Sequence, residues 1–295
     1  MIELTIGMAV YKDFDGAYFT IQDLRLHQDM ENVEILLVDN FGCDTTAAFT
    51  ASTGPNNPVR YIRYLEKTGT AAPRQKVFEE ARGKAVLCMD SHVLMAPGTI
   101  ARLKQHYRDH PKTNDLYQGP ILWDGLKDRS SHFQPVWNNY MFGTWGLDPR
   151  LELGEPFEIP MQGLGIFSCR KEAWLGFNPK FKGFGGEEFY IHEKFRQAGN
   201  KCWCLPWLAW VHRFGRPQGV PYPNLLEDRV WNYLIGWKEL GLPLDSIYEH
   251  FLETMAGGVI ARVAQEALGT KVRIRVEEEA EGEFRAQSLK LVRAA

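Results

Sequence analysis

The chain has 295 residues, 44% hydrophobic and 24% charged, which is typical of one large α/β domain or of one such domain with an appendage. Its formal net charge is -3, so no broad basic field exists to drive sequence-independent binding to nucleic acid or anionic lipid. No run of about 18 apolar residues occurs, so we expect no membrane-spanning helix. Residues 1–7 do not resemble a signal peptide. Together with five scattered cysteines, expected to be buried free thiols, this predicts a cytoplasmic protein.

The first 90 residues alternate strand and helix signals. The runs at 33–38 and 85–89 are continuously apolar, which is typical of parallel strands covered on both faces. Leu24 and Leu26 are expected on the buried side of the first helix. The order predicts a nucleotide-binding α/β layer of the doubly wound type. We expect strands over 4–10, 33–38, 59–65 and 85–89, and helices over 17–28 and 73–81.

The remaining residues change in character along the chain. Residues 111–160 are rich in Pro, Gly, Trp and Asn and weakly periodic, which indicates functional loops or a lid. We predict a nucleotide-binding domain over 1–216 and a mainly helical C-terminal extension over 217–295. The elements expected in these parts are strands over 163–168, 202–211 and 272–276, and helices over 170–175, 187–198, 225–239 and 245–266.

Two predicted strands end in residues that can bind a metal ion. Asp90-Ser91-His92 follows the strand 85–89, and His212 follows the strand 202–211. In open α/β sheets, ligands bind beyond the carboxyl ends of strands. Their oxygen and nitrogen atoms suit Mn²⁺ and also Zn²⁺, and three ligands with open positions would form a catalytic site. The alternative is that Asp90 caps a turn and that both histidines are structural.

Gly185, Gly186, Glu187 and Glu188 open the helix predicted over 187–198. The glycines allow the backbone to approach a ligand closely. Paired carboxylates beside a diphosphate could act as a base or contact sugar hydroxyls. The alternative is that the helix dipole alone favours acidic residues in a first turn.

Four further side chains are candidates. Asp39 ends the strand 33–38 and could accept a hydrogen bond from a base or a ribose, or only cap that strand. Arg74, in the first turn of the helix 73–81, could face a base or diphosphate, or solvent. Trp137 and Trp145 of the irregular segment could stack on an acceptor or fill a core.

The order of these motifs resembles that of a GT-A glycosyltransferase. The segments LTIGMAVYKD, EILLVDNFGCDTT and GTAAPRQKVFEEARGKAVLCMDSH are similar to glycosyltransferase family 2. The segments DSH, MQGLGIF, FGGEEF and VHRF resemble, in the same order, motifs of the polypeptide N-acetylgalactosaminyltransferases. The resemblance covers residues 1–216 and implies a GT-A fold, with a mostly parallel central sheet flanked by helices.

The resemblance implies a metal-dependent glycosyltransferase whose donor is a nucleotide-diphosphate sugar, with UDP as the expected nucleotide. Mn²⁺, or another divalent cation such as Mg²⁺, is the implied cofactor. The expected acceptor is an intracellular glycan, protein, small metabolite or modified DNA, with Trp137 and Trp145 as candidate contacts. The residues implied are the metal ligands Asp90, His92 and His212, the catalytic residues Asp90, Glu187 and Glu188, and the donor contacts Ala9, Tyr11, Asp39, Arg74, Gly163, Gly185 and Gly186.

The stereochemical course is open at Glu188. The retaining family has an amide there, whereas inverting GT-A enzymes with a G-G-E-D motif place a base carboxylate there. A base at Glu188 implies inversion, but DSH together with VHRF favours retention, which we expect. A mobile loop within 125–160 or 213–223 is expected to close over the donor and exclude water.

Two other functions fit the same α/β layer. A nucleotidyltransferase or sugar pyrophosphorylase would normally carry a glycine-rich basic loop after the first strand, and residues 11–16 are poor in glycine. A non-catalytic nucleotide- or glycan-binding protein with this fold is the second alternative. The presence of Asp90, His92, His212 and Glu187 argues against it.

Overall fold

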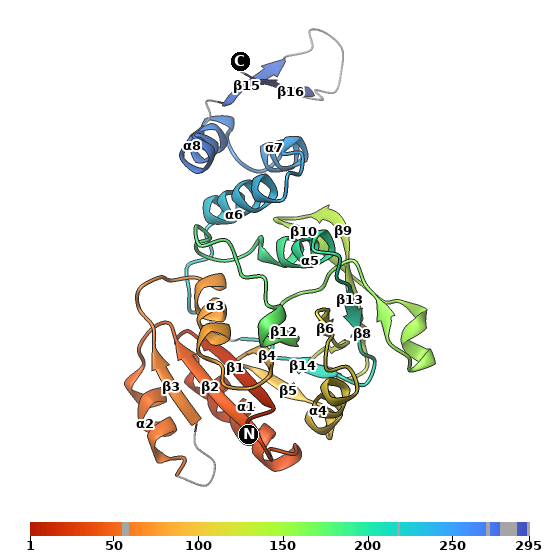
Figure 1. Cartoon of the computed structure of the whole chain (residues 1–295). Coiled ribbons are helices and arrows are strands. Elements are labelled where there is room, and N and C mark those ends of the chain that lie inside the picture. Colours follow the sequence, from red (N-terminus) through yellow and green to blue (C-terminus); the bar gives the residue numbers. More distant parts are fainter. Residues whose placement is uncertain (55–58, 217–218, 270–271, 278–287, 294–295) are drawn as a thin grey trace.

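The computed structural model describes residues 1–54, 59–216, 219–269, 272–277 and 288–293. An eight-stranded mixed sheet forms its centre, in the order β11-β13-β6-β12-β4-β1-β2-β3 (Figure 1). Four neighbouring strands, the predicted ones, run parallel: β1 (Leu4–Val10), β2 (Val33–Asp39), β3 (Val59–Arg63) and β4 (Ala85–Asp90). The sheet continues with β12 (Ile166–Arg170), antiparallel to β4, and then with β6 (Leu116–Gln118), β13 (Cys202–Cys204) and β11 (Phe157–Glu158).

Both faces of the parallel strands are buried, which explains their continuous apolar runs. Leu36 and Cys88 belong to the core cluster that includes Val77 of α3 (Ala71–Glu80). Leu37 and Met89, their neighbours along the strands, belong to the other cluster, together with residues of α1 (Phe14–His27) and α4 (Thr99–Asp109). Two further helices of this part of the chain are α2 (Asp44–Ser52) and α5 (Glu187–Gln197).

A smaller sheet beside the main one holds β5 (Val93–Met95), β14 (Trp210–His212), β7 (Ile121–Leu122) and β8 (Arg129–Ser130). In it, β14 pairs with β5 so that His212 lies opposite Val93. This pairing brings His212 next to the segment that follows β4, although the two are far apart in the sequence. A hairpin of β9 (His132–Asn138) and β10 (Met141–Gly146) and two short 3-10 helices, Pro149–Leu153 and Lys171–Ala173, complete this part.

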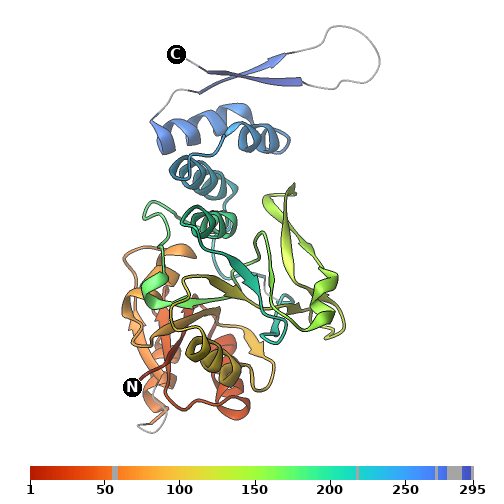
Figure 2. The same ribbon diagram turned by 45° about the vertical axis from the view of Figure 1, so that its right-hand side comes forward.

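The last part of the chain forms α6 (Leu226–Glu239), α7 (Asp245–Leu252) and α8 (Gly257–Leu268), followed by a hairpin of β15 (Val272–Glu277) and β16 (Ser288–Arg293). Figures 1 and 2 show these helices stacked beyond α5, with the hairpin at the far end. Ile235 and Leu240 of this part belong to the same core cluster as Phe195 of α5. The division at residue 216 stays a prediction. None of the helices in the described residues is long and apolar enough to cross a membrane.

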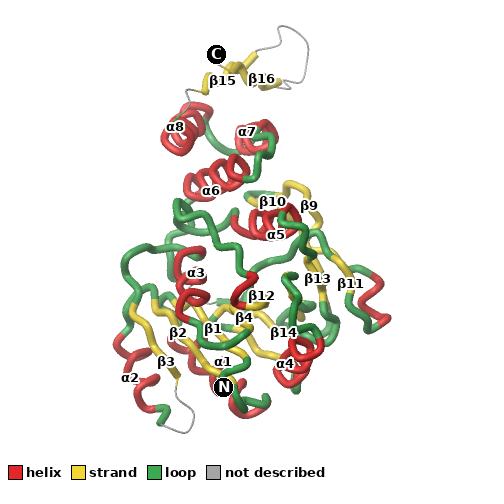
Figure 3. Tube along the Cα trace, in the orientation of Figure 1, coloured by secondary structure: helices red, strands yellow, loops and turns green. Residues whose placement is uncertain are grey.

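Several expected elements differ from those observed (Figure 3). The strand expected over 202–211 is two strands in different sheets, because the chain turns at 205–209. The helix expected over 245–266 is interrupted between Leu252 and Gly257. The irregular segment 111–160 contains β6 to β11. The expectation for Leu26 was wrong: Leu24 is buried, but Leu26 is 76% exposed.

Candidate active site

A pocket of about 700 Å³ opens where β1 and β4 end. This volume lies within the range of small-molecule sites. Its position is the one expected for an open α/β sheet. Segments from distant places in the chain line the pocket, among them Ala9 to Tyr11, Thr68 to Thr70, Asp90 to His92, Gly163 to Gly165, Lys182 to Glu188, and residues between Tyr222 and Tyr233.

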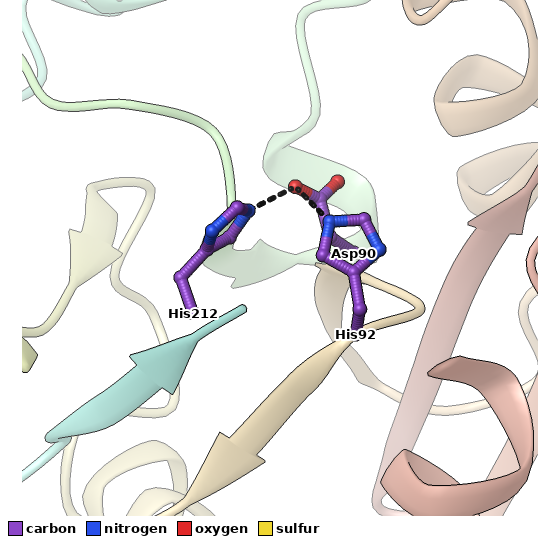
Figure 4. Close-up of side chains that lie close together, drawn as sticks. All are labelled: Asp90, His92 and His212. Atoms are coloured by element: carbon purple, nitrogen blue, oxygen red, sulfur yellow. Dashed lines mark ion pairs between the residues drawn. The ribbon is translucent and has the colours of Figure 1, made fainter. Parts of the chain in front are cut away.

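Three side chains, Asp90, His92 and His212, form what we call the metal edge of the pocket. Figure 4 shows the Asp90 carboxylate between the two imidazoles. Asp90 Oδ2 lies 3.6 Å from His212 Nε2 and 4.0 Å from His92 Nε2. One ligand atom from each residue can be chosen so that all lie within 4.8 Å of one another.

This arrangement fits a divalent cation. Two donors that are each about 2.1 Å from one cation are at most about 4.2 Å apart, and both distances to Asp90 meet this limit. The separations in the whole set extend to 4.8 Å, so the side chains would close by a few tenths of an ångström around one ion. One carboxylate and two imidazoles suit Mn²⁺ or Zn²⁺. Burial raises the pKa of Asp90, but Arg74 and the hydrogen bond with His212 lower it more, so the carboxylate stays ionised.

Arg74 connects the metal edge to the glutamate pair. Its Nη2 donates to Asp90 Oδ1 at 2.8 Å, and its Nη1 donates to Glu187 Oε1 at 3.1 Å. Burial lowers the pKa of Arg74, but the charges of Asp90 and Glu187 raise it more, so it remains a cation. The Thr70 hydroxyl also donates to Glu187 Oε1. Glu187 Oε2 is buried and accepts no hydrogen bond from the described residues.

Glu188 differs from Glu187, which is in an ion pair with Arg74. Among the described residues, no Lys, Arg or His side chain forms an ion pair with Glu188. Gly186 N donates to its Oε2 at 3.2 Å, and the residue lines the pocket. Burial, and then the charge of Glu187, raise the pKa of Glu188 to about 7. A carboxyl group with such a pKa can exchange a proton near neutral pH.

The glycines before this pair have conformations that other residues rarely adopt. Gly185 and Gly186 have φ angles of 91° and 90°. A Cβ atom on Gly185 would also lie 2.5 Å from Arg229 Nε. Both observations explain why glycine stands at these two positions of the pocket.

Residues Asp228, Arg229 and Tyr233 of α6 line the side of the pocket that we call the helical wall. Asn232, in the same helix, is buried and binds the loop before Glu187. Its Nδ2 donates to Lys182 O at 2.7 Å and to Gly185 O at 2.8 Å, and its Oδ1 accepts from Lys182 N at 3.0 Å. The sequence reasoning missed these residues. The one signal in the sequence was Asn232, a single amide within the apolar run VWNYLIGW. A polar side chain buried in such a run is normally hydrogen-bonded, so it indicates a specific partner.

The pocket also contains parts of the chain between residues 213 and 225. Arg216 Nη2 lies 2.5 Å from His92 Nε2, and the Tyr222 ring stacks on Phe184 with centroids 5.2 Å apart. The mobility predicted for this loop and for 125–160 stays a prediction.

Most of the predicted contacts meet in the pocket, but two do not. Ala9, Tyr11, Arg74, Gly163 and Trp145 line it, as do Gly185, Gly186, Glu187 and Glu188.

The first exception is Asp39. It is fully buried, and its carboxylate accepts from the backbone of Phe41, Gly42 and Cys43 and from the Tyr61 hydroxyl. These bonds correspond to the capping alternative considered for this residue. The second is Trp137. Its ring lies against His250, at 4.6 Å between centroids, and against Tyr233 and Trp237.

The sequence profile of the family described as "Glycosyl transferase family 2" matches residues 5–163, more than half of the chain. N-acetylgalactosaminyltransferase 7 of Drosophila melanogaster is 26% identical over 168 residues, which are 50% of this chain and 28% of that protein. The match therefore spans less than a third of that relative.

The solved structures that are similar to the chain include two glycosyltransferases bound to Mn²⁺. The crystal structure of GalNAc-T7 with UDP, GalNAc and Mn²⁺ has a TM-score of 0.65 at 15% identity, over 86% of this chain and 54% of that chain. The mannosyltransferase PcManGT of Pyrobaculum calidifontis, in complex with GDP-Man and Mn²⁺, has a TM-score of 0.52 at 16% identity, over 90% and 74%. At these identities the likeness concerns the fold alone, and it confirms the predicted GT-A fold.

Proposed function

We propose that this chain, which belongs to glycosyl transferase family 2, transfers a sugar from a nucleotide-diphosphate donor to an acceptor in the pocket. The observation that carries the proposal is the metal edge, which shares one pocket with Glu187 and Glu188. The relatives support UDP as the nucleotide, since the GalNAc-T7 structure contains UDP. A cytoplasmic location is part of the proposal and is supported by five free cysteines.

Asp90, His92 and His212 would hold Mn²⁺ or another divalent cation, which neutralises the negative charge that develops on the leaving diphosphate. Mn²⁺ is present in both similar structures. Arg74 keeps Asp90 ionised and in place through the 2.8 Å ion pair. Ala9, Tyr11 and Gly163 lie around the same space and would contact the donor.

Glu187 suits a contact to the donor sugar. Its Oε1 is fixed by Arg74 and Thr70, whereas its buried Oε2 has a free acceptor position among the described residues. Buried acceptors are normally satisfied, so a sugar hydroxyl donating there would complete the arrangement. A carboxylate fixed in this way would orient the sugar.

Glu188 suits the role of general base. In its ionised form it would take the proton from an acceptor hydroxyl while that oxygen forms its bond to the anomeric carbon. The nucleoside diphosphate leaves with the electron pair of the broken bond. This course gives inversion. Retention, favoured by the DSH and VHRF motifs, would require attack on the same face as the leaving group, and Glu188 would then have another role.

The acceptor is the least defined partner. Trp145 lines the pocket and can stack on a flat face of the acceptor, whereas Trp137 lies outside the pocket. We include a glycan, a protein, a small metabolite and modified DNA in the proposal, and the net charge of -3 makes a nucleic acid the least favoured of these.

The test is donor binding with and without metal. A panel of UDP- and GDP-sugars is screened by thermal shift in the presence and absence of Mn²⁺, with wild type and Asp90→Ala. We expect a stabilising shift for one donor that needs both Mn²⁺ and Asp90. Donor binding of equal strength in Asp90→Ala would contradict the metal assignment. The anomer formed in a subsequent transfer assay, read by NMR, decides between inversion and retention.

A further inference from the structure

The two ring nitrogens of His92 have different partners. Nε2 faces the pocket, 4.0 Å from Asp90 Oδ2 and 2.5 Å from Arg216 Nη2. Nδ1 faces away from Asp90 and lies 2.8 Å from Oδ2 of Asp13. Asp13 belongs to the loop after β1, 79 residues earlier in the chain.

These contacts define which nitrogen carries the proton. A guanidinium group only donates hydrogen bonds, so the contact with Arg216 requires a lone pair on His92 Nε2. An ionised carboxylate only accepts, so the contact with Asp13 requires a proton on Nδ1. Both partners select the same neutral tautomer of the ring. The nitrogen that keeps its lone pair is Nε2, which is the one 4.0 Å from Asp90 Oδ2, and a cation would take the place of Arg216 at this atom.

The absence of a side chain at Gly16 leaves space for the Asp13 carboxylate. Asp13 is the N-cap of α1, and its Oδ1 accepts from Gly16 N at 3.2 Å. A Cβ atom on residue 16 would lie 2.5 Å from Asp13 Oδ2, so any larger residue at Gly16 would displace the oxygen that binds His92.

Asp13 also binds the residue that follows the second histidine of the metal edge. Arg213 Nη2 donates to Asp13 Oδ1 at 2.8 Å, and Arg213 directly follows His212. The backbone N–H of Arg213 donates to His92 O at 3.2 Å. The Asp13 carboxylate therefore contacts the proposed ligand His92 and also Arg213, which is next to the proposed ligand His212. The segments that meet there come from β1, β4 and β14.

We infer that Asp13 is a positioning residue, which fixes the tautomer and orientation of His92 so that Nε2 can bind the cation. The inference rests on the proposed function, because that function supplies the cation. It extends the site to Asp13, which lines the pocket and contacts His92 but is not one of the three proposed metal ligands. Loss of such an outer carboxylate typically lowers metal affinity by about 10- to 100-fold.

The experiment compares three variants of the full chain. Asp13→Ser keeps a good helix N-cap but removes the partner of His92 Nδ1. Asp13→Asn keeps an oxygen that can accept from Nδ1 but removes the charge. Asp15→Ser is the matched control, because Asp15 is an exposed carboxylate in the same helical turn. Mn²⁺ affinity is measured by EPR of the free ion. The His92 tautomer is read by ¹⁵N NMR of the metal-free proteins at constant pH.

We expect Asp13→Ser to bind Mn²⁺ about 10- to 100-fold more weakly and to show a mixture of His92 tautomers. Asp13→Asn should lie between this variant and wild type, and Asp15→Ser should match wild type. A lower melting temperature of Asp13→Ser with unchanged Mn²⁺ affinity and a single tautomer would overturn the inference alone, leaving Asp13 as a helix cap. Absence of Mn²⁺ binding by wild type would overturn the metal site of the proposed function and this inference with it.

Discussion

The metal edge consists of residues at strand ends, whereas the helical wall consists of residues in the middle of α6. Asp90 ends β4 and His212 ends β14, so the sheet pairing places them. Arg229 and Tyr233 reach the pocket because α6 packs on α5 and binds the loop at Gly185 through Asn232. The residues of the metal edge can therefore be recognised locally in the sequence, because they follow apolar runs, although the pairing of β14 with β5 is what brings them together. A wall made by a packed helix depends on long-range contacts.

Removing the metal edge should have the largest effect. Asp90→Asn keeps the shape of the side chain but loses the charge that the cation and Arg74 require. We expect turnover to fall by more than about 10⁴-fold, since a bound cation contributes several kcal/mol to the stabilisation of the transition state. A radiolabelled-sugar transfer assay measures this. The control is Asp109→Asn at the exposed end of α4, which should retain wild-type turnover.

Glu188→Gln tests the opposite side of the pocket, where α5 begins. If Glu188 is the base, kcat should fall by about 10²- to 10⁴-fold while donor binding stays intact. Single-turnover kinetics and calorimetry separate the two quantities. Glu193→Gln in the same helix, outside the pocket, serves as the control. Near-normal kcat in Glu188→Gln would remove this residue as the base.

The pH dependence sharpens the same point. Because burial and Glu187 raise the pKa of Glu188 to about 7, the ionised base is the minor form below that pH. We expect kcat/KM to rise about tenfold per pH unit below pH 7 and to level off above it. This limb of the profile should disappear in Glu188→Gln. A wild-type profile that is flat between pH 5.5 and about 8 would contradict the assignment.

Asn232→Ala tests whether the helical wall holds the glutamate pair in place. The variant leaves the buried carbonyl of Gly185 and the backbone N–H and carbonyl of Lys182 without their Asn232 partners, which should lower the free energy of unfolding by about 2–3 kcal/mol. We also expect kcat/KM to fall about tenfold because Glu187 and Glu188 are less well fixed. Urea unfolding and steady-state kinetics measure both. Lys238→Ala, exposed on the same helix, should change neither. An unchanged kcat/KM in a less stable Asn232→Ala would show that the wall is only structural.

The smallest effect concerns the two tryptophans. Trp145→Ala should raise the KM for the acceptor by up to about tenfold, because the ring lines the pocket. Trp137→Ala should lower the melting temperature and leave this KM unchanged, because its ring lies against Tyr233, Trp237 and His250. The opposite pattern would show that Trp137 and not Trp145 meets the acceptor.

Much of the fold and the metal edge could be predicted because the signals are local. Continuous apolar runs indicated the parallel strands, and Asp90 and His212 were recognised because they stand where such runs end. The helix α2 was missed, since its sequence DTTAAFTAS is short and shows little amphipathic periodicity. The prediction for Leu26 was wrong because the buried side of a helix depends on what packs against it. The hydrophobic pattern of the last turn of this helix does not show which side that is.

The remaining differences at the site arise from long-range contacts, and the donor contact of Asp39 stays a prediction. Asp39 stands at a strand end like Asp90, yet three backbone N–H groups and the Tyr61 hydroxyl occupy its carboxylate. Its sequence context alone does not distinguish the two aspartates. Arg229 and Asn232 lie beyond the region covered by the recognised motifs. Their role became visible only when α6 was seen beside α5.

The packing of α6 has a consequence for exchanging parts between relatives. Ile235 and Leu240 share a core with Phe195, and Tyr233 OH accepts a hydrogen bond from the backbone N–H of Phe142 at 2.7 Å. A chimaera joined at residue 216 would replace one half of this core and one wall of the pocket at once. A junction after Leu240 would keep all the lining of the pocket on one side of the join. It would instead divide the core that Tyr233 and Trp237 share with Ile247 and Phe251, so the exchanged helices would have to keep side chains that match α6.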